Sequence, residues 1–205
     1  MRSRPAIIVT AAGLGSRFGG AVHKLDQVFD GTTVLVSTVR HAIRSTLPVL
    51  VVTTAGRAAA LAGVLAERDI VVLTEAQAAR GMGASIATGV VERSGSRGWL
   101  VLPGDMPLVQ PATLLAVAGA LEQHPVAYAQ YRGRRGHPVA FAAELYSELV
   151  QLSGDDGVRR VMLRYPAHGQ EVEDPGVLLD IDTPADLDIL RKVQAEVQLI
   201  KGDGG

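Results

Sequence analysis

The sequence predicts a doubly wound α/β fold, with a mostly parallel sheet covered by helices on both faces. Four apolar runs in the first half of the chain are continuous rather than alternating, as in strands that are buried on both sides. These runs are Ala6–Thr10, Val49–Thr53, Ile70–Leu73 and Trp99–Leu102. Stretches long enough for crossover helices follow them, namely Val34–Arg44, Arg57–Arg68, Met82–Arg93 and Pro111–Glu122. This alternation of strands and helices is typical of a parallel α/β sheet, in which ligands bind beyond the carboxyl ends of the strands.

The second half of the chain is less regular. Val126–Tyr131 and Pro138–Phe141 flank a glycine-containing turn at residues 132–136 and are interpreted as two paired strands. The pattern then predicts helices at Glu144–Leu152 and Asp156–Tyr165, a last strand at Val177–Ile181 and a closing helix at Thr183–Gln198. Thr183 is the expected N-cap of that helix and Pro184 its first residue. Residues 199–205 are expected to fray.

Length and composition limit the classes of function. The 205 residues correspond to one domain, 1–205, at roughly 150 residues per domain. Lys+Arg number 20 and Asp+Glu 21, a balance that argues against nucleic-acid binding and polybasic membrane binding. The chain has no cysteine, which excludes disulfides and fits a cytoplasmic location. Its apolar runs are too short for a membrane span or, at Ala6–Val9, for a signal peptide.

A glycine-rich segment, Thr10–Gly20, follows the first predicted strand. Small residues allow the backbone to approach a ligand closely, and successive N–H groups can form an anion-binding nest. Arg17, and Lys24 seven positions later, add positive charge where phosphates would lie. The spacing matches neither the dinucleotide fingerprint nor a Walker loop. We expect a phosphate-binding loop, the alternative being a simple glycine turn with a solvated arginine.

Two acidic positions follow predicted strands. Asp105, in Leu102–Pro107, stands where a carboxylate can hold Mg²⁺ against a triphosphate, although it could also cap a turn. Asp182 lies between the last predicted strand and the closing helix. Asp180 and Asp182 would point the same way if that strand continued through them. Asp182 alone is interpreted as part of a helix-capping turn, and it becomes a candidate second metal ligand only when paired with Asp105.

On the basis of these and further motifs, the chain resembles the molybdopterin nucleotidyltransferases, and most closely the molybdenum cofactor cytidylyltransferases. The resemblance runs from Ile7 to about Leu190 and rests on six ordered segments: AAGLGSRFG, GMGASIATG, LPGDMP, YRGRRGHPVAF, LSGDDGVR and DIDTPADL. It implies a Rossmann-like sheet of the nucleotide-diphospho-sugar transferase type. It also implies Mg²⁺ and transfer of a nucleotidyl group from an NTP to the terminal phosphate of molybdopterin. A molybdoenzyme or its chaperone is the implied recipient of the product.

The resemblance also assigns roles to individual residues. Catalysis falls to Arg17, Lys24 and Asp105, and metal binding to Asp105 and Asp182. Nucleotide binding falls to Ala11, Ala12, Gly13, Leu14, Gly15, Ser16, Arg17, Lys24, Gly81, Ser85, Pro103 and Gly104. Acceptor binding falls to Arg134, Arg135, His137, Asp155 and Arg159. Ser85 is equally well explained as an N-terminal helix residue, and His137 as a turn or packing residue.

The identity of the nucleotide depends on a small difference in the loop. Ala11-Ala12-Gly13 is similar to the form of cytidine-using relatives, whereas guanylyl-transferring relatives carry Ala-Gly-Gly. A methyl group at position 12 narrows the pocket against a purine, an effect worth about 1–3 kcal/mol. CTP is therefore the expected substrate.

Three alternatives remain open at this point. The first is a guanylyltransferase acting on the same cofactor. The second is a cytidylyltransferase acting on another phosphorylated small molecule, because Arg17 and Lys24 lie two residues further apart than in most relatives. That longer spacing is similar to the cytidylyltransferases of isoprenoid synthesis, and it leaves open whether Lys24, His23 or Arg17 reaches the phosphates. The third alternative is a nucleotide-binding chaperone that delivers a finished cofactor.

Overall fold

The predicted doubly wound α/β architecture is confirmed by a computed structural model of the protein. It describes residues 4–13, 15, 18–19 and 22–202, with the backbone alone from residue 196 on. A seven-stranded sheet has the order β5-β4-β1-β6-β8-β7-β9. Four parallel strands form one half: β1 (Ala6–Ala11), β4 (Val49–Thr54), β5 (Ile70–Leu73) and β6 (Gly98–Pro103). The long strand β8 (Arg134–Ala142) runs antiparallel to both β6 and β7 (Val126–Tyr131), and β9 (Ala167–Glu171) closes the edge parallel to β7.

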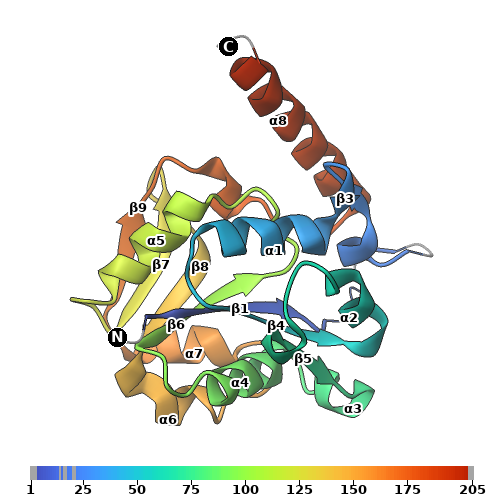
Figure 1. The fold of residues 1–205 in the computed structure, drawn as a ribbon. Coiled ribbons are helices and arrows are strands. Elements are labelled where there is room, and N and C mark those ends of the chain that lie inside the picture. Colours follow the sequence, from blue (N-terminus) through green and yellow to red (C-terminus); the bar gives the residue numbers. More distant parts are fainter. Residues whose placement is uncertain (1–3, 14, 16–17, 20–21, 203–205) are drawn as a thin grey trace.

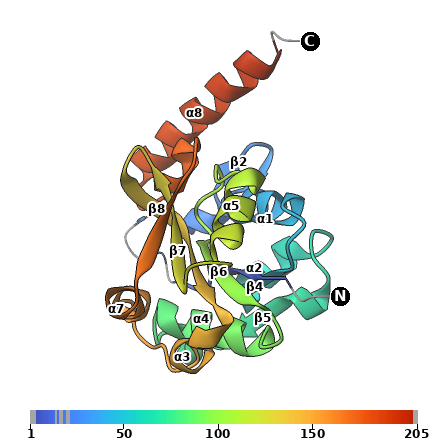
Figure 2. The same cartoon turned by 90° about the vertical axis from the view of Figure 1, so that its left-hand side faces the viewer.

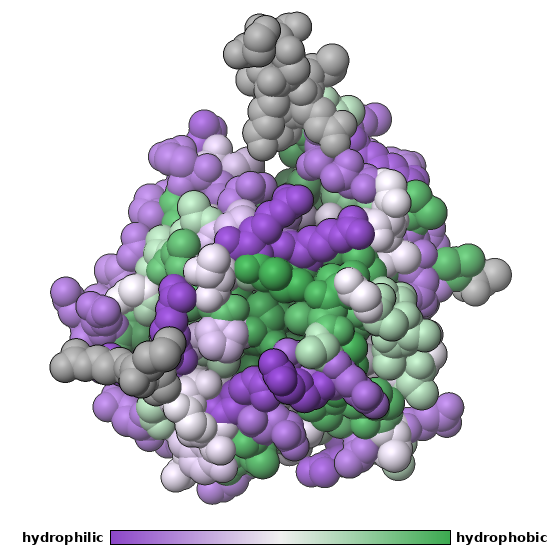
Figure 3. Space-filling model, in the orientation of Figure 1, coloured by the Kyte–Doolittle hydropathy of each residue, from purple (hydrophilic) through white to green (hydrophobic). Residues whose placement is uncertain are grey.

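Helices lie on both faces of this sheet (Figure 1). One face packs against α1 (Val34–Arg44), α5 (Pro111–Ala120) and the start of α8 (Pro184–Gly202). The other face packs against α3 (Glu75–Ala78), α4 (Met82–Glu92), α6 (Tyr146–Leu149) and α7 (Gly157–Arg164). The sheet therefore separates two apolar cores. Seen from the side of Figure 1, apolar residues lie between the two helical layers and hydrophilic residues border them (Figure 3).

Shorter elements connect these layers. Helix α2 (Ala55–Leu61) follows β4, and a small antiparallel pair, β2 (Val28–Phe29) and β3 (Thr32–Thr33), precedes α1. Four 3-10 helices complete the described chain: η1 (Lys24–Asp26), η2 (Glu67–Asp69), η3 (Ala143–Leu145) and η4 (Pro175–Leu178).

The predicted last strand at Val177–Ile181 is wrong. The segment contains η4 and then irregular backbone, although Val177 and Ile181 are fully buried. An apolar run shows burial but not hydrogen-bond pairing, so the pattern could not separate a strand from a buried turn. The actual edge strand, β9, has the polar sequence AHGQE and gives no strand signal.

Three other predicted boundaries also differ. The helix expected at Arg57–Arg68 is α2, which ends at Leu61, and Gly63 soon after it has a φ of +82°. The helix expected at Glu144–Leu152 is η3 followed by the single turn α6. The turn expected at residues 132–136 is confined to two residues with positive φ, Arg132 and Gly133, because β8 already begins at Arg134.

Thr183 is confirmed as the N-cap of the last helix. Its hydroxyl oxygen accepts the Asp186 N–H at 3.3 Å, and the Asp186 carboxylate accepts the Thr183 N–H at 2.6 Å, which makes a reciprocal cap. The helix continues past the predicted end to Gly202 and extends away from the body of the molecule in both views (Figures 1 and 2). Of the helices that the structure describes, none is both long and apolar enough to cross a membrane.

Candidate functional site

The site lies where β1 and β6 end. The two strands are parallel neighbours with Thr10 opposite Pro103, so the segments that follow them leave the sheet at the same edge. The Gly104 N–H donates to the Thr10 carbonyl at 3.0 Å. A Cβ at Gly104 would lie 3.1 Å from that carbonyl oxygen, so a larger residue would fit only with a shift of a few tenths of an ångström. Asp105 is thereby placed directly beside the end of β1.

Thr38 of α1 fixes the same turn from the other side. Its hydroxyl, on a residue only 1% exposed, lies 2.9 Å from the Gly104 carbonyl and 3.0 Å from the Val34 carbonyl, and it donates to these oxygens. The backbone before Asp105 is therefore held by both β1 and α1. This contact was missed by the sequence analysis, because a threonine inside a predicted helix gives no sign of its partner on another element.

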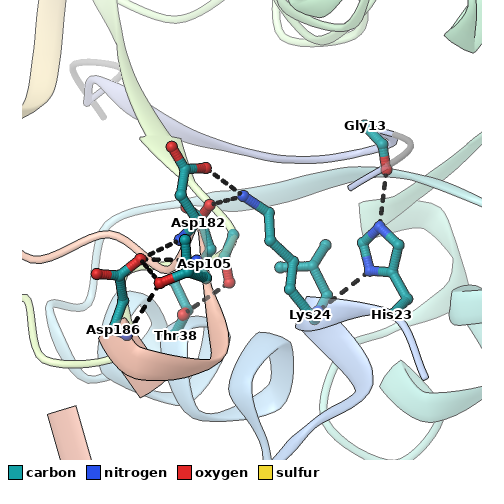
Figure 4. Close-up of polar contacts among 10 residues, drawn as sticks. Gly13, His23, Lys24, Thr38, Asp105, Asp182 and Asp186 are labelled. Carbon is teal, nitrogen blue, oxygen red and sulfur yellow. Dashed lines mark hydrogen bonds and ion pairs between the residues drawn. The ribbon is translucent and has the colours of Figure 1, made fainter. Parts of the chain in front are cut away.

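Lys24 brings the two predicted carboxylates together (Figure 4). Its Nζ lies 2.6 Å from Asp105 Oδ2 and 3.2 Å from Asp182 Oδ1. The lysine comes from η1, Asp105 from the end of β6 and Asp182 from the segment before α8. Three segments distant in sequence thus meet at one point, although the strand expected to orient Asp180 and Asp182 is not formed.

Burial and charge set the ionisation of this cluster. Burial raises the pKa of Asp105 above its usual value, and Lys24 opposes that shift. Burial alone would lower the pKa of Lys24, but the attraction of Asp105 and Asp182 outweighs it and raises the pKa. Asp105 Oδ1 is buried and has no hydrogen-bond partner among the described residues. Two carboxylates with a spare buried oxygen are a donor set that suits a hard divalent cation.

Much of the glycine-rich segment lies outside the described residues. Leu14, Ser16 and Arg17 fall there, so the structure places none of the three. Ala11 and Ala12 are buried at the end of β1, and the Thr53 hydroxyl of β4 donates to the Ala11 carbonyl at 3.3 Å. Gly13 and Gly15 both lie next to His23, the residue before Lys24.

The start of α4 packs against residues predicted to bind the acceptor. The Asp155 carboxylate accepts the Met82 N–H at 2.9 Å, and the Gly83 N–H donates to the Gly154 carbonyl at 2.8 Å. Gly81 has a φ of +86°, and a Cβ there would lie 2.8 Å from the Gly154 backbone. Gly81 and Asp155 therefore form one structural contact. Ser85 is buried on the same helix, at 3% exposure.

The predicted acceptor residues do not form a single cluster. Arg135 contacts the Met162 sulfur of α7 and lies over the Tyr128 ring, 5.0 Å from its centroid. Arg134 is exposed on the neighbouring position of β8, where side chains alternate between the faces of the sheet. Arg159 lines a shallow hollow of about 490 Å³ near Asp155 and Arg160.

His137 is different, because it is electrostatically coupled to the carboxylate cluster. Burial lowers the pKa of His137 below its usual value, while Asp105 and Asp180 act in the opposite direction. Its Nδ1 is buried and has no hydrogen-bond partner among the described residues. Arg135 also lowers the pKa of His137, so this histidine is influenced both by the carboxylates of the site and by an arginine of β8.

Sequence reasoning also missed two charged residues near the site. Asp174 is 4% exposed, and its carboxylate accepts bonds from the Gln110 N–H, the Thr113 hydroxyl and the Gly176 N–H. It holds the start of α5 against η4. The Nε of Arg57 in α2 lies 3.6 Å from the Oδ2 of Asp26 in η1. Its position shortly after the strand β4 was the sequence signal that could have identified it.

A doubly wound sheet with a glycine segment, a lysine and two carboxylates at its carboxyl edge defines a nucleotide-binding α/β protein of the transferase type. The chain belongs to the MobA-like NTP transferase domain family, whose model matches residues 7–171. It is therefore a nucleotidyltransferase.

The chain is also similar to individual proteins. The purine catabolism protein PucB of Bacillus subtilis is 31% identical over 127 residues, which cover 58% of this chain and 60% of PucB. The molybdenum cofactor cytidylyltransferase of Escherichia coli is 23% identical over 190 residues, covering 93% of this chain and 97% of the relative. Among solved structures, Rv0371c of Mycobacterium tuberculosis is 28% identical with a TM-score of 0.78, covering 94% of this chain and 99% of its own. A manganese complex of that protein superposes with a TM-score of 0.70 at 26% identity, covering 93% of this chain and 98% of its own.

Proposed function

We propose that this protein transfers CMP from CTP to the terminal phosphate of molybdopterin and releases pyrophosphate, with Mg²⁺ as its metal. The observation that carries the proposal is the meeting of Lys24, Asp105 and Asp182 at the carboxyl edge of the sheet. The cytidylyltransferase activity of the Escherichia coli relative, which aligns over nearly the whole chain, supports the choice of reaction.

The residues around Asp105 fit a divalent metal. Asp105 and Asp182 would hold it, and the buried Asp105 Oδ1 has the free lone pairs that such an ion requires. When bound, the ion would neutralise negative charge on the triphosphate. The manganese complex of Rv0371c, a protein of the same fold, supports a divalent ion in this class.

The remaining tasks fall to the chain itself. Lys24, the backbone of the glycine-rich segment and Arg17 bind the β- and γ-phosphates. A phosphate oxygen of the acceptor attacks the α-phosphorus of CTP in line, and the bond from that phosphorus to the β-phosphate breaks as pyrophosphate leaves. A phosphate monoester is already ionised at neutral pH, so the step needs no general base. Orientation and charge neutralisation therefore supply the catalysis.

The preference for CTP rests on Ala12. Ala12 lies directly after β1 and is 2% exposed within the apolar core. The preference follows from the similarity of Ala11-Ala12-Gly13 to the form of cytidine-using relatives. Ser85, buried at the start of α4, is the second residue assigned to the base and ribose. One methyl group accounts for about 1–3 kcal/mol of discrimination, enough to prefer a pyrimidine over a purine without excluding the purine.

The test is to incubate the purified protein with Mg²⁺, molybdopterin and each of CTP, GTP, ATP and UTP, and to identify the product by mass. We expect the CMP adduct and pyrophosphate from CTP. A GMP adduct in its place would show a guanylyltransferase. Transfer to other phosphorylated acceptors but not to molybdopterin would contradict the acceptor. Binding of CTP, seen as a raised melting temperature, without pyrophosphate release would instead show a carrier.

A further inference from the structure

His23, the residue before Lys24, connects η1 to the glycine-rich segment. Its Nδ1 accepts the Leu25 N–H at 3.1 Å and so caps η1. Because Nδ1 acts as an acceptor, the proton of the neutral ring lies on Nε2. Nε2 lies 3.1 Å from the Gly13 carbonyl oxygen and donates to it (Figure 4). One neutral ring thus bridges the two segments.

The glycine-rich segment also packs directly on this ring. Gly15 has a φ of +61°, and a Cβ there would lie 2.4 Å from His23 Nε2. A side chain at position 15 would therefore displace a ring that two hydrogen bonds hold in place. Gly13 and Gly15 contact His23 in two independent ways, one polar and one steric.

The surroundings keep the ring neutral. Burial lowers the pKa of His23 below its usual value, and the nearby positive charges of Arg57 and Lys24 lower it further. The Gly13 carbonyl and Asp26 act in the opposite direction. The neutral tautomer that both hydrogen bonds require is therefore the one that these groups favour near neutral pH.

We propose that His23 is a positioning residue that holds Gly13 and Gly15 in place for the triphosphate and in register with Lys24. The proposal rests on the proposed nucleotidyl transfer. A carbonyl oxygen carries partial negative charge, so a loop that binds phosphates must keep its carbonyls away from the anion. The bond to Nε2 holds the Gly13 carbonyl and prevents it from turning towards a phosphate. The same ring caps the η1 turn that presents Lys24, so it couples the positions of Gly13 and Gly15 to the position of that ammonium group.

Two amide variants separate the two bonds of the ring. In His23→Asn, the shorter amide can still accept the Leu25 N–H but cannot reach Gly13. In His23→Gln, the longer amide can donate to Gly13 from the position of Nε2 but no longer caps η1. The pair therefore forms a matched control, because each variant keeps one bond and loses the other.

We expect His23→Asn to raise the KM for CTP by about fivefold, with kcat within about twofold, and His23→Gln to keep a KM close to that of the wild type. Equal KM values in both variants, whether raised or unchanged, would overturn the proposal, because His23 would then act as a helix cap or not at all.

A second readout does not need turnover. Amide hydrogen exchange in peptides spanning residues 10–19 is expected to accelerate in His23→Asn and to stay at the wild-type rate in His23→Gln. Exchange that is equal in both variants would overturn the proposal even if CMP transfer is found. If the protein shows the expected exchange pattern but transfers no nucleotide, the proposed function is contradicted, while the positioning role of His23 is supported.

Discussion

One ammonium group compensates two partly buried carboxylates at the edge of the sheet. The Lys24 side chain is 15% exposed and that of Asp105 12%. A buried charge without a partner costs several kcal/mol, so Lys24 makes the cluster tolerable in the free protein.

At the scale of single residues, three partly buried histidines predict a pH dependence of stability. Burial lowers the pKa of His23, His41 and His137 in the folded state. The unfolded chain takes up protons near the usual imidazole value of about 6.5, whereas the folded chain resists them. The free energy of unfolding is therefore expected to fall between about pH 7.5 and about pH 5.5, as measured by urea denaturation.

His41 of α1 allows this pH dependence to be tested at a single residue. Burial and Arg44 both lower its pKa. In His41→Gln one group no longer takes up a proton on unfolding, so the fall in stability over the same pH range should be smaller. An unchanged fall would contradict the assignment of a lowered pKa to His41.

The residues that sequence could identify are those whose role follows from position along one segment. Asp105 was predicted because it follows an expected strand, where parallel sheets bind ligands, and Asp182 because it could pair with Asp105 at another expected strand end. Lys24 was predicted because it adds positive charge after the glycine-rich segment. Asp174 and Asp155 have roles that depend on partners more than 60 residues away, Thr113 and Met82. Nothing in their own segments specifies those partners, so sequence alone did not reveal Asp174 and gave Asp155 a different role.

At the scale of elements, the start of α4 depends on the loop before α7. Gly81 carries no side chain to cap the helix, and the Asp155 carboxylate supplies the cap from the neighbouring loop. A loop that carries predicted acceptor residues therefore also fixes the helix that carries Ser85. Movement of one would change the other, which couples the two halves of the candidate site.

Asp155→Ala is expected to lower the free energy of unfolding by about 1 kcal/mol, the usual effect of losing a helix cap. Asp156→Ala is the matched control, since Asp156 is the neighbouring exposed residue and makes no side-chain cap on α7. Its effect should stay within about 0.5 kcal/mol. Equal effects of the two substitutions in urea denaturation would show that the contact with Met82 contributes nothing.

Element prediction succeeded where apolar runs were continuous, including β5 at one edge of the sheet, and failed at the opposite edge, which β9 forms. The strands β1, β4, β5 and β6 match the predicted runs to within one residue at either end. The strand β9 is polar and pairs with only one neighbour, β7. The burial of Val177 and Ile181, by contrast, comes from packing around η4. Hydropathy reports burial, and at these two places burial and strand pairing do not coincide.

At the scale of the whole molecule, one sheet separates two cores. Trp99, the only tryptophan, is 1% exposed and belongs to the core beneath α4 and α6. Leu100, the next residue of β6, belongs to the other core. Because neighbouring residues of the same strands build both cores, neither is expected to persist without the other. The single domain expected from the length stays a prediction.

Unfolding should therefore be cooperative. Trp99 fluorescence, which reports one core, and far-UV circular dichroism, which reports the whole sheet and its helices, are expected to give the same denaturant midpoint. Addition of CTP and Mg²⁺ should raise both midpoints together. Separate transitions would contradict the single domain.

The most direct test of the central claim is the rate of pyrophosphate release from CTP, with Mg²⁺ and molybdopterin, in Asp105→Asn. Asn keeps the shape of the side chain but removes the charge, and Asp180→Asn, an exposed acid of the same neighbourhood, is the control. We expect kcat to fall by at least about 100-fold in Asp105→Asn and by less than about threefold in Asp180→Asn. A folded Asp105→Asn protein with a nearly wild-type rate would contradict the account.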